Sequence, residues 1–266
     1  VSQRRELEAS TELAFVTTRG PMESVPQLYF TDLELWRVHA AITPLGGLRI
    51  DASATFLPKQ PATLDEPFWQ AAALGGRIAL GDWAALGVDA SFGKLMRDLG
   101  SHGSSALSFQ ARTLMNRYFI WEGSVGLIGT RLWPSPATGT AFWFAEAGAS
   151  GQFQLCWNQC DEHRGATWLG IDLAVPIYHH PGAVDPSDPV PIDPRTRLGL
   201  TLGSFFNVNK TWDFYATVSW IDRGDPDVPN TQLPIVDGGF DQIQVAFGVI
   251  AHWWLEPSVV SPYPED

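Results

Sequence analysis

The sequence predicts an all-β fold, a transmembrane antiparallel up-and-down β-barrel of about twelve strands. The first reason is composition: 17% of the 266 residues are charged and 45% are hydrophobic, whereas about a quarter of the residues in a soluble domain carry charge. The second is that no apolar run reaches the ~20 residues that a transmembrane helix needs. The hydrophobic residues are instead distributed over many short segments, as expected for strands that expose one face to lipid.

Alternation of apolar and polar residues is the third reason. In residues 211–220, apolar side chains take the even positions, and residues 48–56, 197–206 and 240–254 repeat this period of two. The period is typical of strands with one apolar face. The expected strands are 10–18, 28–43, 47–57, 67–81, 83–97, 104–115, 118–133, 139–156, 160–178, 195–207, 211–222 and 240–255.

The connections between these strands alternate between short and long. The short ones lie near 44–47, 81–83, 115–118, 157–159 and 207–211. The longer ones, rich in Pro, Gly and Asp, lie near 19–27, 58–66, 98–103, 134–138, 179–194 and 223–239. Membrane barrels have short turns at one end and long loops at the other. An even number of strands also places both chain ends at the short-turn end, and about ten or about fourteen strands are the alternatives.

The last expected strand carries a pattern of its own. In residues 244–254, QVAFGVIAHWW, Gly248 is followed by spaced apolar and aromatic positions. This resembles the carboxy-terminal assembly signal of bacterial outer-membrane β-barrel proteins, and the whole chain resembles that superfamily in architecture. The sequence departs from this signal in one respect. Many members of the superfamily end on the aromatic residue, whereas here the tail 256–266 follows it. The resemblance implies one barrel domain over 1–266 in the bacterial outer membrane, with a short periplasmic segment 1–9 and the tail 256–266.

The resemblance also implies a topology. We expect residues 179–194 and 223–239 to be extracellular, and residues 44–47 and 207–211 to be periplasmic. Residues 179–194 and 222–239 are acidic, with one base, Arg223, against Asp185, Asp188, Asp193, Asp222, Asp225, Asp227 and Asp237. An acidic mouth favours cations over anions. The alternative is that these residues are ordinary turn residues, as in Asp-Pro and Asp-Gly.

Tryptophan is abundant, with 12 residues in the chain. Near the long-loop ends of the lipid face we place Trp69, Trp133, Trp143 and Trp220. Near the short-turn ends we place Trp83, Trp157, Trp168, Trp212, Trp253 and Trp254. Two such rings are what aromatic girdles at the two membrane interfaces require. Chance placement at strand ends is the alternative interpretation.

Charged residues in the strands are predicted to face the barrel interior, because a charge facing lipid at the midplane costs ~2–4 kcal/mol. The predicted lumen residues are Arg49, Asp51, Arg77, Asp89, Arg112, Glu122, Glu146, Asp172, Arg197 and Asp213. They form either a charged constriction that selects solutes or an ion-pair network that fills a narrow barrel. About twelve strands enclose an interior between filled eight-stranded barrels and open porins.

The favoured function is passive passage of small solutes across the outer membrane. The alternatives are an occluded barrel that anchors a multi-protein envelope complex, and a lipid-modifying hydrolase. A net charge of −12 argues against nucleic acid as a partner. No catalytic set, cofactor or metal site is predicted, because His102 with Ser104 or Ser105, in a long loop, has no assignable acidic partner. The pair His179–His180 is too small for a metal site, and we expect it in a loop turn.

The two cysteines, Cys156 and Cys160, are separated by three residues. Redox chemistry usually needs two intervening residues, and zinc needs more ligands. A disulfide across a hairpin turn, in the oxidising periplasm, is the favoured interpretation.

Two basic residues fall on the apolar face of their strands. Lys94 is in phase with Phe92, and Arg131 is in phase with Leu127. Both lie at the expected extracellular ends, where a long basic side chain can extend to the headgroups. The phosphates of lipopolysaccharide are the predicted partner. Alternatively, the strands end earlier and both residues are simply solvated.

Overall fold

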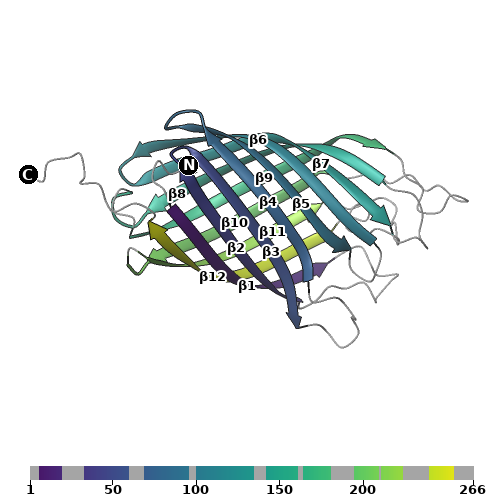
Figure 1. Cartoon of the computed structure of the whole chain (residues 1–266), viewed down its shortest axis with the longest axis horizontal. Helices are drawn as coiled ribbons and strands as arrows, with labels where there is room; N and C mark the ends of the chain where they lie inside the picture. The colour runs from purple at the N-terminus through teal and green to yellow at the C-terminus, as the bar shows by residue number, and fades with distance from the viewer. Residues whose placement is uncertain are drawn as a thin grey trace, which may run out of the picture.

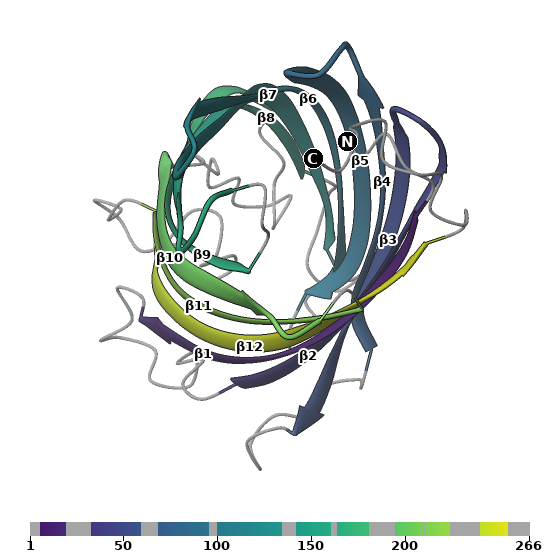
Figure 2. The ribbon, with the colours of Figure 1, turned by 90° about the vertical axis from the view of Figure 1, so that its left-hand side faces the viewer.

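The chain forms a closed barrel of twelve antiparallel strands in which each strand pairs with its sequence neighbours and β1 closes on β12. The computed structural model describes residues 6–19, 33–59, 69–95, 100–134, 142–160, 164–180, 195–209, 211–223 and 240–254. Figure 1 shows the tilted strands from the side, and Figure 2 shows them as a ring seen along the barrel. The predicted fold class and strand number are confirmed. Within these residues, no helix is long and apolar enough to cross a membrane.

The strand bounds agree closely with those expected from the alternation. They are β1 (Glu6–Arg19), β2 (Leu33–Leu45), β3 (Leu48–Lys59), β4 (Trp69–Ala79), β5 (Ala84–Leu95), β6 (Gly100–Asn116), β7 (Phe119–Pro134), β8 (Phe142–Cys156), β9 (Gly165–His180), β10 (Arg197–Asn207), β11 (Trp212–Arg223) and β12 (Phe240–Trp254). One correction concerns the expected periplasmic segment 1–9. Residues 6–9 belong to β1 because Glu6 and Glu8 continue its polar face.

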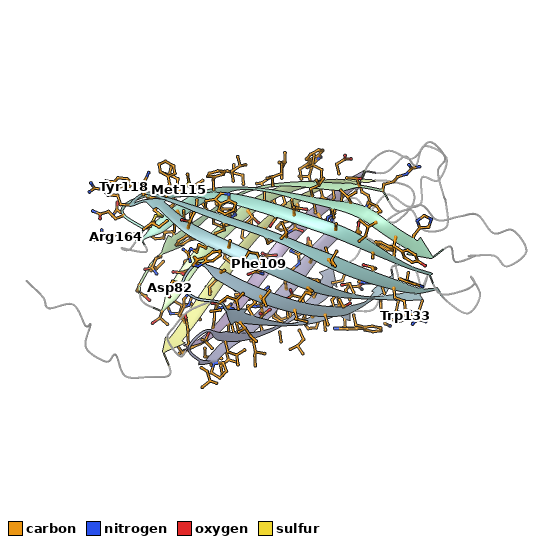
Figure 3. All side chains as sticks on the ribbon, turned by 90° about the horizontal axis from the view of Figure 1, so that it is seen from above. Asp82, Phe109, Met115, Tyr118, Trp133 and Arg164 are labelled. Atoms are coloured by element: carbon orange, nitrogen blue, oxygen red, sulfur yellow. A yellow bond between two sulfur atoms is a disulfide. The ribbon has the colours of Figure 1, made fainter. Side chains whose placement is uncertain are left out.

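The outer face of the barrel is apolar. In β9, Leu169, Ile171 and Val175 are exposed, whereas Ala174, one position from Val175, is fully buried. Figure 3 shows the side chains over the whole length of the barrel, with Tyr118 and Asp82 towards one end and Trp133 towards the other. Exposed apolar side chains at alternate positions are stable only against lipid, which is the environment the sequence predicts.

Exposed tryptophans occur at both ends of the outer face. Trp133 and Trp143 lie at the long-connection end, and Trp83, Trp157, Trp212 and Trp253 lie at the other. Trp69 stacks on the exposed Phe92, with ring centroids 6.1 Å apart. Trp220 lies in the pairing row of Leu200 and Ile243. The side chain of Trp254 lies outside the described residues.

Trp168 is a correction to the predicted girdles. It pairs with Gln154 and Gly203 on the inner face, and its ring lies over Gly203, where a Cβ would collide with it. Tyr215 covers Gly248 in the same way. A ring lying over a cross-strand glycine fills interior space that no second side chain can enter.

Four of the short turns lie where the sequence predicts them, but the expected turn at 157–159 is wrong, because β9 begins at Gly165 rather than at residue 160. Gly47 and Gly81 have φ angles of 83° and 107°, a left-handed region that favours glycine. The Asn116 side chain accepts hydrogen bonds from the backbone N–H groups of Tyr118 and Phe119, at 2.8 and 3.1 Å. Such Asx turns close tight hairpins. The predicted extracellular loops 179–194 and 223–239 lie mostly outside the described residues, but His179 and His180 belong to β9 rather than to a loop.

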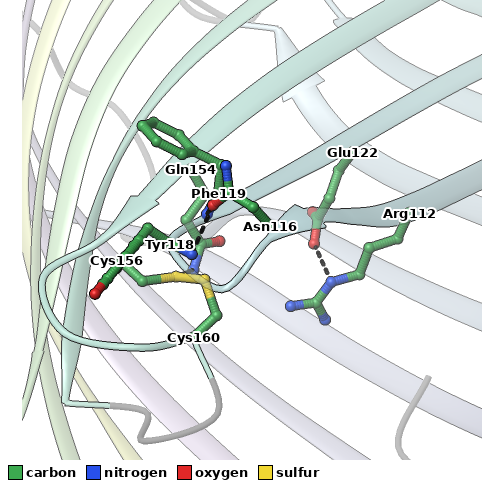
Figure 4. The surroundings of a disulfide bond; sticks show 8 residues. All are labelled: Arg112, Asn116, Tyr118, Phe119, Glu122, Gln154, Cys156 and Cys160. Atoms are coloured by element: carbon green, nitrogen blue, oxygen red, sulfur yellow. Dashed lines mark hydrogen bonds and ion pairs between the residues drawn. A yellow bond between two sulfur atoms is a disulfide. The ribbon is translucent and has the colours of Figure 1, made fainter.

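A disulfide joins Cys156 and Cys160, whose Cα atoms are 5.2 Å apart. Both cysteines are buried and pack with Ile120 and Ala166. The Cys160 N–H donates to the Arg117 carbonyl at 2.7 Å. Figure 4 shows the bridge beside the neighbouring turn. The disulfide therefore fixes the turn after β8, and the Cys160 hydrogen bond joins this turn to the one between β6 and β7.

Candidate functional site

The inner face of the barrel is polar, and all ten predicted lumen residues lie on it. In each strand they alternate with the exposed apolar residues of the outer face. Ion pairs tie nine of them together in three groups, on β1–β5, β6–β7 and β8–β11, and the tenth, Asp213, pairs with His252 on β12. These groups define the candidate site.

The first group is a ladder of alternating charge on β1, β3, β4 and β5. Arg49 donates to both carboxylate oxygens of Glu8, at 2.9 and 3.2 Å. Arg77 lies between two carboxylates, with its guanidinium 2.5 Å from Asp51 and 3.4 Å from Asp89. The bidentate and bridging contacts neutralise most of the charge along this wall.

His39 on β2 extends the ladder. Its ring nitrogens lie 3.9 Å from Glu8 and 3.9 Å from Asp51. Sequence reasoning missed His39, although it shares the inner-face parity of Arg37 and Ala41. The signal was present in the alternation of β2, where Trp36 and Ile42 are exposed on the other face.

A second set of contacts joins the first strands to the last. Glu12 on β1 accepts from Arg37 at 2.6 Å and from the Tyr215 hydroxyl at 2.9 Å, and Arg37 also donates to Gln244 at 2.9 Å. The cluster links β1, β2, β11 and β12. It therefore supports the closure between β1 and β12 from inside the barrel.

His252 lies at the short-turn end of the interior. Its two ring nitrogens lie 2.7 Å from Glu6 and 3.0 Å from Asp213, and Asp213 also accepts from Asn207. Ligand atoms of Glu6, Glu8 and His252 fall within 4.8 Å of one another, as a metal site would require. Because carboxylates engage both ring nitrogens, however, the ring has no free nitrogen for an ion in this arrangement.

A buried ion pair bridges β8 and β11. Arg223 reaches over β9 and β10 to place its Nη2 atom 3.0 Å from Glu146, and only 8% and 3% of the two side chains are exposed. Ala174 on β9 is fully buried in the row beneath, where its small side chain leaves room for the bridge. Arg223 also donates to the Arg195 carbonyl at 3.1 Å. The expectation that Arg223 and Asp222 are loop residues is wrong, because both belong to β11.

The wall formed by β5–β8 differs from the ladder. Its inner residues are mostly uncharged and form cross-strand hydroxyl pairs, Ser91 with Ser104 at 2.6 Å and Ser124 with Ser150 at 2.7 Å. An ion pair, Arg112 with Glu122 at 3.1 Å, lies at the short-turn end with 55% and 39% of its side chains exposed. We call the face made by Ser104, Ser108, Gln110, Ser124, Ser150 and Gln152 the neutral wall.

The residues considered for a hydrolase, His102 with Ser104 or Ser105, do not all lie on one face of the barrel. His102 lies in β6, where its ring approaches Gly93 on the inner face. Ser104 also faces inward, bonded to Ser91. Ser105 faces outward and is exposed. The expectation that His102 lies in a loop is corrected, because β6 begins at Gly100.

Comparison with known proteins rests on structure alone. No protein-family model matches the chain, and no curated protein matches it. An outer membrane channel from Pseudomonas putida F1 superposes with a TM-score of 0.54 at 7% identity, over 95% of this chain and 97% of that one. The NanC porin gives 0.52 at 8% identity, over 90% and 98%. The KdgM porin in complex with oligogalacturonate gives 0.51 at 6% identity, over 91% and 98%.

These similarities decide the fold. The chain has the fold of bacterial outer-membrane β-barrels. The apolar outer face described above is the kind of surface that barrels of this fold present to lipid. Identities below a tenth carry no information about a solute.

Proposed function

We propose that the barrel is a channel for the passive passage of small solutes across the outer membrane. The observation that carries the proposal is a charged inner face whose side chains stay partly exposed, including Arg112 at 55% and Asp89 at 38%. A barrel filled by its own side chains would bury such groups, because packed interiors leave few voids. The P. putida neighbour is itself called a channel, and NanC and KdgM are called porins.

The test is single-channel recording in planar bilayers with a matched pair of variants. Ser150 faces the interior and Ala149, its neighbour in β8, faces lipid, and both are exposed. We expect discrete conductance steps from the unchanged protein. Ser150→Trp should lower the step size because the indole occupies the lumen, whereas Ala149→Trp should leave it unchanged.

Silence from the folded, unchanged protein would count against the channel and favour the occluded anchor. Equal steps from both tryptophan variants would mean that current does not pass along this inner face. Heat-dependent mobility on gels identifies the folded barrel in either case.

We also propose that Lys94 and Arg131 bind lipopolysaccharide phosphates. Both side chains are exposed on the outer face. The Arg131 guanidinium lies 5.3 Å from the centre of the Trp133 ring. A hollow of about 560 Å³ opens beside Arg131, lined by Phe92, Gly103, Ser105, Gly129, Arg131, Trp133 and Trp143 among others. A basic side chain above an apolar hollow suits a lipid with a phosphate and acyl chains.

Lys94→Glu with Arg131→Glu should lower the lipopolysaccharide that copurifies with the folded barrel by about tenfold or more, since a hydrogen bond to a charged group contributes ~1.5–3 kcal/mol. The control is Arg117→Glu, which changes an exposed basic residue in a turn at the opposite end. Quantifying lipid A in purified samples gives the result. Equal retention by the double variant and the control would exclude the contact.

A further inference from the structure

The neutral wall contains a cavity of about 410 Å³ near the short-turn end of the lumen. Polar side chains from three adjacent strands line it: Gln110 and Arg112 from β6, Glu122 and Ser124 from β7, and Ser150 and Gln152 from β8. Its volume falls within the range of ~300–1,000 Å³ that is usual for small-molecule sites.

The register places these groups in two parallel rows. Gln110, Ser124 and Ser150 are direct cross-strand neighbours, and Arg112, Glu122 and Gln152 form the next row. Strands lie ~4.8 Å apart and alternate residues on one face ~6.6–7 Å apart. The cavity therefore presents a flat grid of hydrogen-bonding groups, held by the rigid sheet rather than by a loop.

The row on the other side of Gln110, Ser124 and Ser150 carries little side-chain bulk. It consists of Ser108, Gly126 and Gly148. A Cβ at Gly126 would lie 2.5 Å from the Leu107 carbonyl oxygen and 3.2 Å from the Ser108 Cα, so the backbone itself excludes a side chain there.

The chemistry of the lining favours an uncharged ligand. Hydroxyl and amide groups both donate and accept hydrogen bonds. The Arg112 and Glu122 charges face each other at 3.1 Å, so neither is left as a counter-charge for a solute ion. A solute rich in hydroxyl groups can exchange its hydrogen bonds to water for bonds to this grid without the desolvation cost of an ion.

We propose that this cavity is a binding site for uncharged, hydroxyl-rich solutes of the sugar class as they pass through the lumen. The proposal rests on the proposed channel function and adds its solute class. Gln110 and Gln152 supply amide donors and acceptors on either side of the Ser124–Ser150 pair, and the Arg112–Glu122 pair supplies a strong donor and a strong acceptor.

The test measures block of the ion current by a neutral sugar. Maltose is added to the unchanged channel in a planar bilayer, and maltobionate, which carries a carboxylate on nearly the same skeleton, is added in a parallel series. We expect a saturable current block by maltose at lower concentration than by maltobionate. Gln110→Ala with Gln152→Ala should raise the half-blocking maltose concentration about tenfold, because two hydrogen-bonding side chains are lost.

The matched control removes a bonded polar pair from another part of the inner face. Thr201 and Ser219 are 3.0 Å apart on β10 and β11, and Thr201→Ala with Ser219→Ala should leave the half-blocking concentration unchanged. If the glutamine double variant does not fold, Ser124→Ala with Ser150→Ala takes its place, with the same expected direction.

The possible failures are distinguishable. A channel that conducts but shows no saturable block by maltose, or stronger block by maltobionate, overturns the sugar site and leaves the channel intact. An equal rise of the half-blocking maltose concentration in the glutamine double variant and in the control also overturns the sugar site. A folded barrel that conducts no ions overturns the channel function and the sugar site together.

Discussion

Glu146→Leu should lower the free energy of unfolding by about 3–5 kcal/mol, because it leaves the Arg223 guanidinium buried without its carboxylate. The Arg223 side chain is 8% exposed and its guanidinium also donates to the Arg195 carbonyl, but its charge is paired with Glu146 at 3.0 Å. Arg223 further packs over Phe144, with its guanidinium carbon 6.0 Å from the ring centre. The side chain therefore has little freedom to move into water when its partner is removed.

The measurement is equilibrium unfolding in urea, followed by tryptophan fluorescence, on barrel refolded into vesicles. Glu146→Leu combined with Arg223→Met should recover most of the loss, since both buried charges are then gone. Glu122→Gln is the matched control, because it breaks an ion pair that is 55% and 39% exposed, and such pairs contribute about 0–1 kcal/mol. A similar loss for Glu122→Gln and Glu146→Leu would show that burial is not the cause.

The strands were predictable because the membrane imposes a strict rule on them. Each lipid-facing position must be apolar and each strand crosses the same thickness, so the period of two in residues 211–220 and 240–254 is clear in the sequence. The structure places β11 at Trp212–Arg223 and β12 at Phe240–Trp254. Most short turns were also predictable, because Asn, Gly and Asp have defined roles in tight hairpins.

Which charges meet inside the barrel was not predictable from alternation. Parity places Glu146 on the inner face, but its partner lies three strands away on β11 and is set by register and curvature. Arg223 was assigned to a loop because the strand end was placed one residue too early.

Trp168 shows the opposite case, in which a signal was present and not used. Trp168 was assigned to the lipid face because it lies near a strand end. Its even position, however, puts it on the face opposite to that of the outward Leu169 and Ile171. Glu6 and Glu8 were missed because the expected strand began at residue 10, and the apolar Leu7 between them marks the same alternation.

Removing the two arginines of the ladder should make the channel strongly cation-selective at low salt. Arg49→Gln with Arg77→Gln leaves Glu8, Asp51 and Asp89 on one wall without their bases. Unpaired carboxylates raise the local concentration of cations and lower that of anions. We expect the ratio of potassium to chloride permeability, measured from reversal potentials, to rise severalfold over the unchanged protein.

Salt dependence tests whether the ladder faces the conducting path. The Debye length falls from ~30 Å at 0.01 M to ~3 Å at 1 M, so the permeability ratios of the variant and the unchanged protein should converge at high salt. The matched control, Glu8→Gln with Asp51→Asn, removes two acids from the same wall and should shift the ratio towards chloride. If both double variants keep the unchanged ratio at low salt while still conducting, the ions pass elsewhere and the ladder is a structural network, because two charges of either sign on a conducting wall must change the ion concentrations beside it.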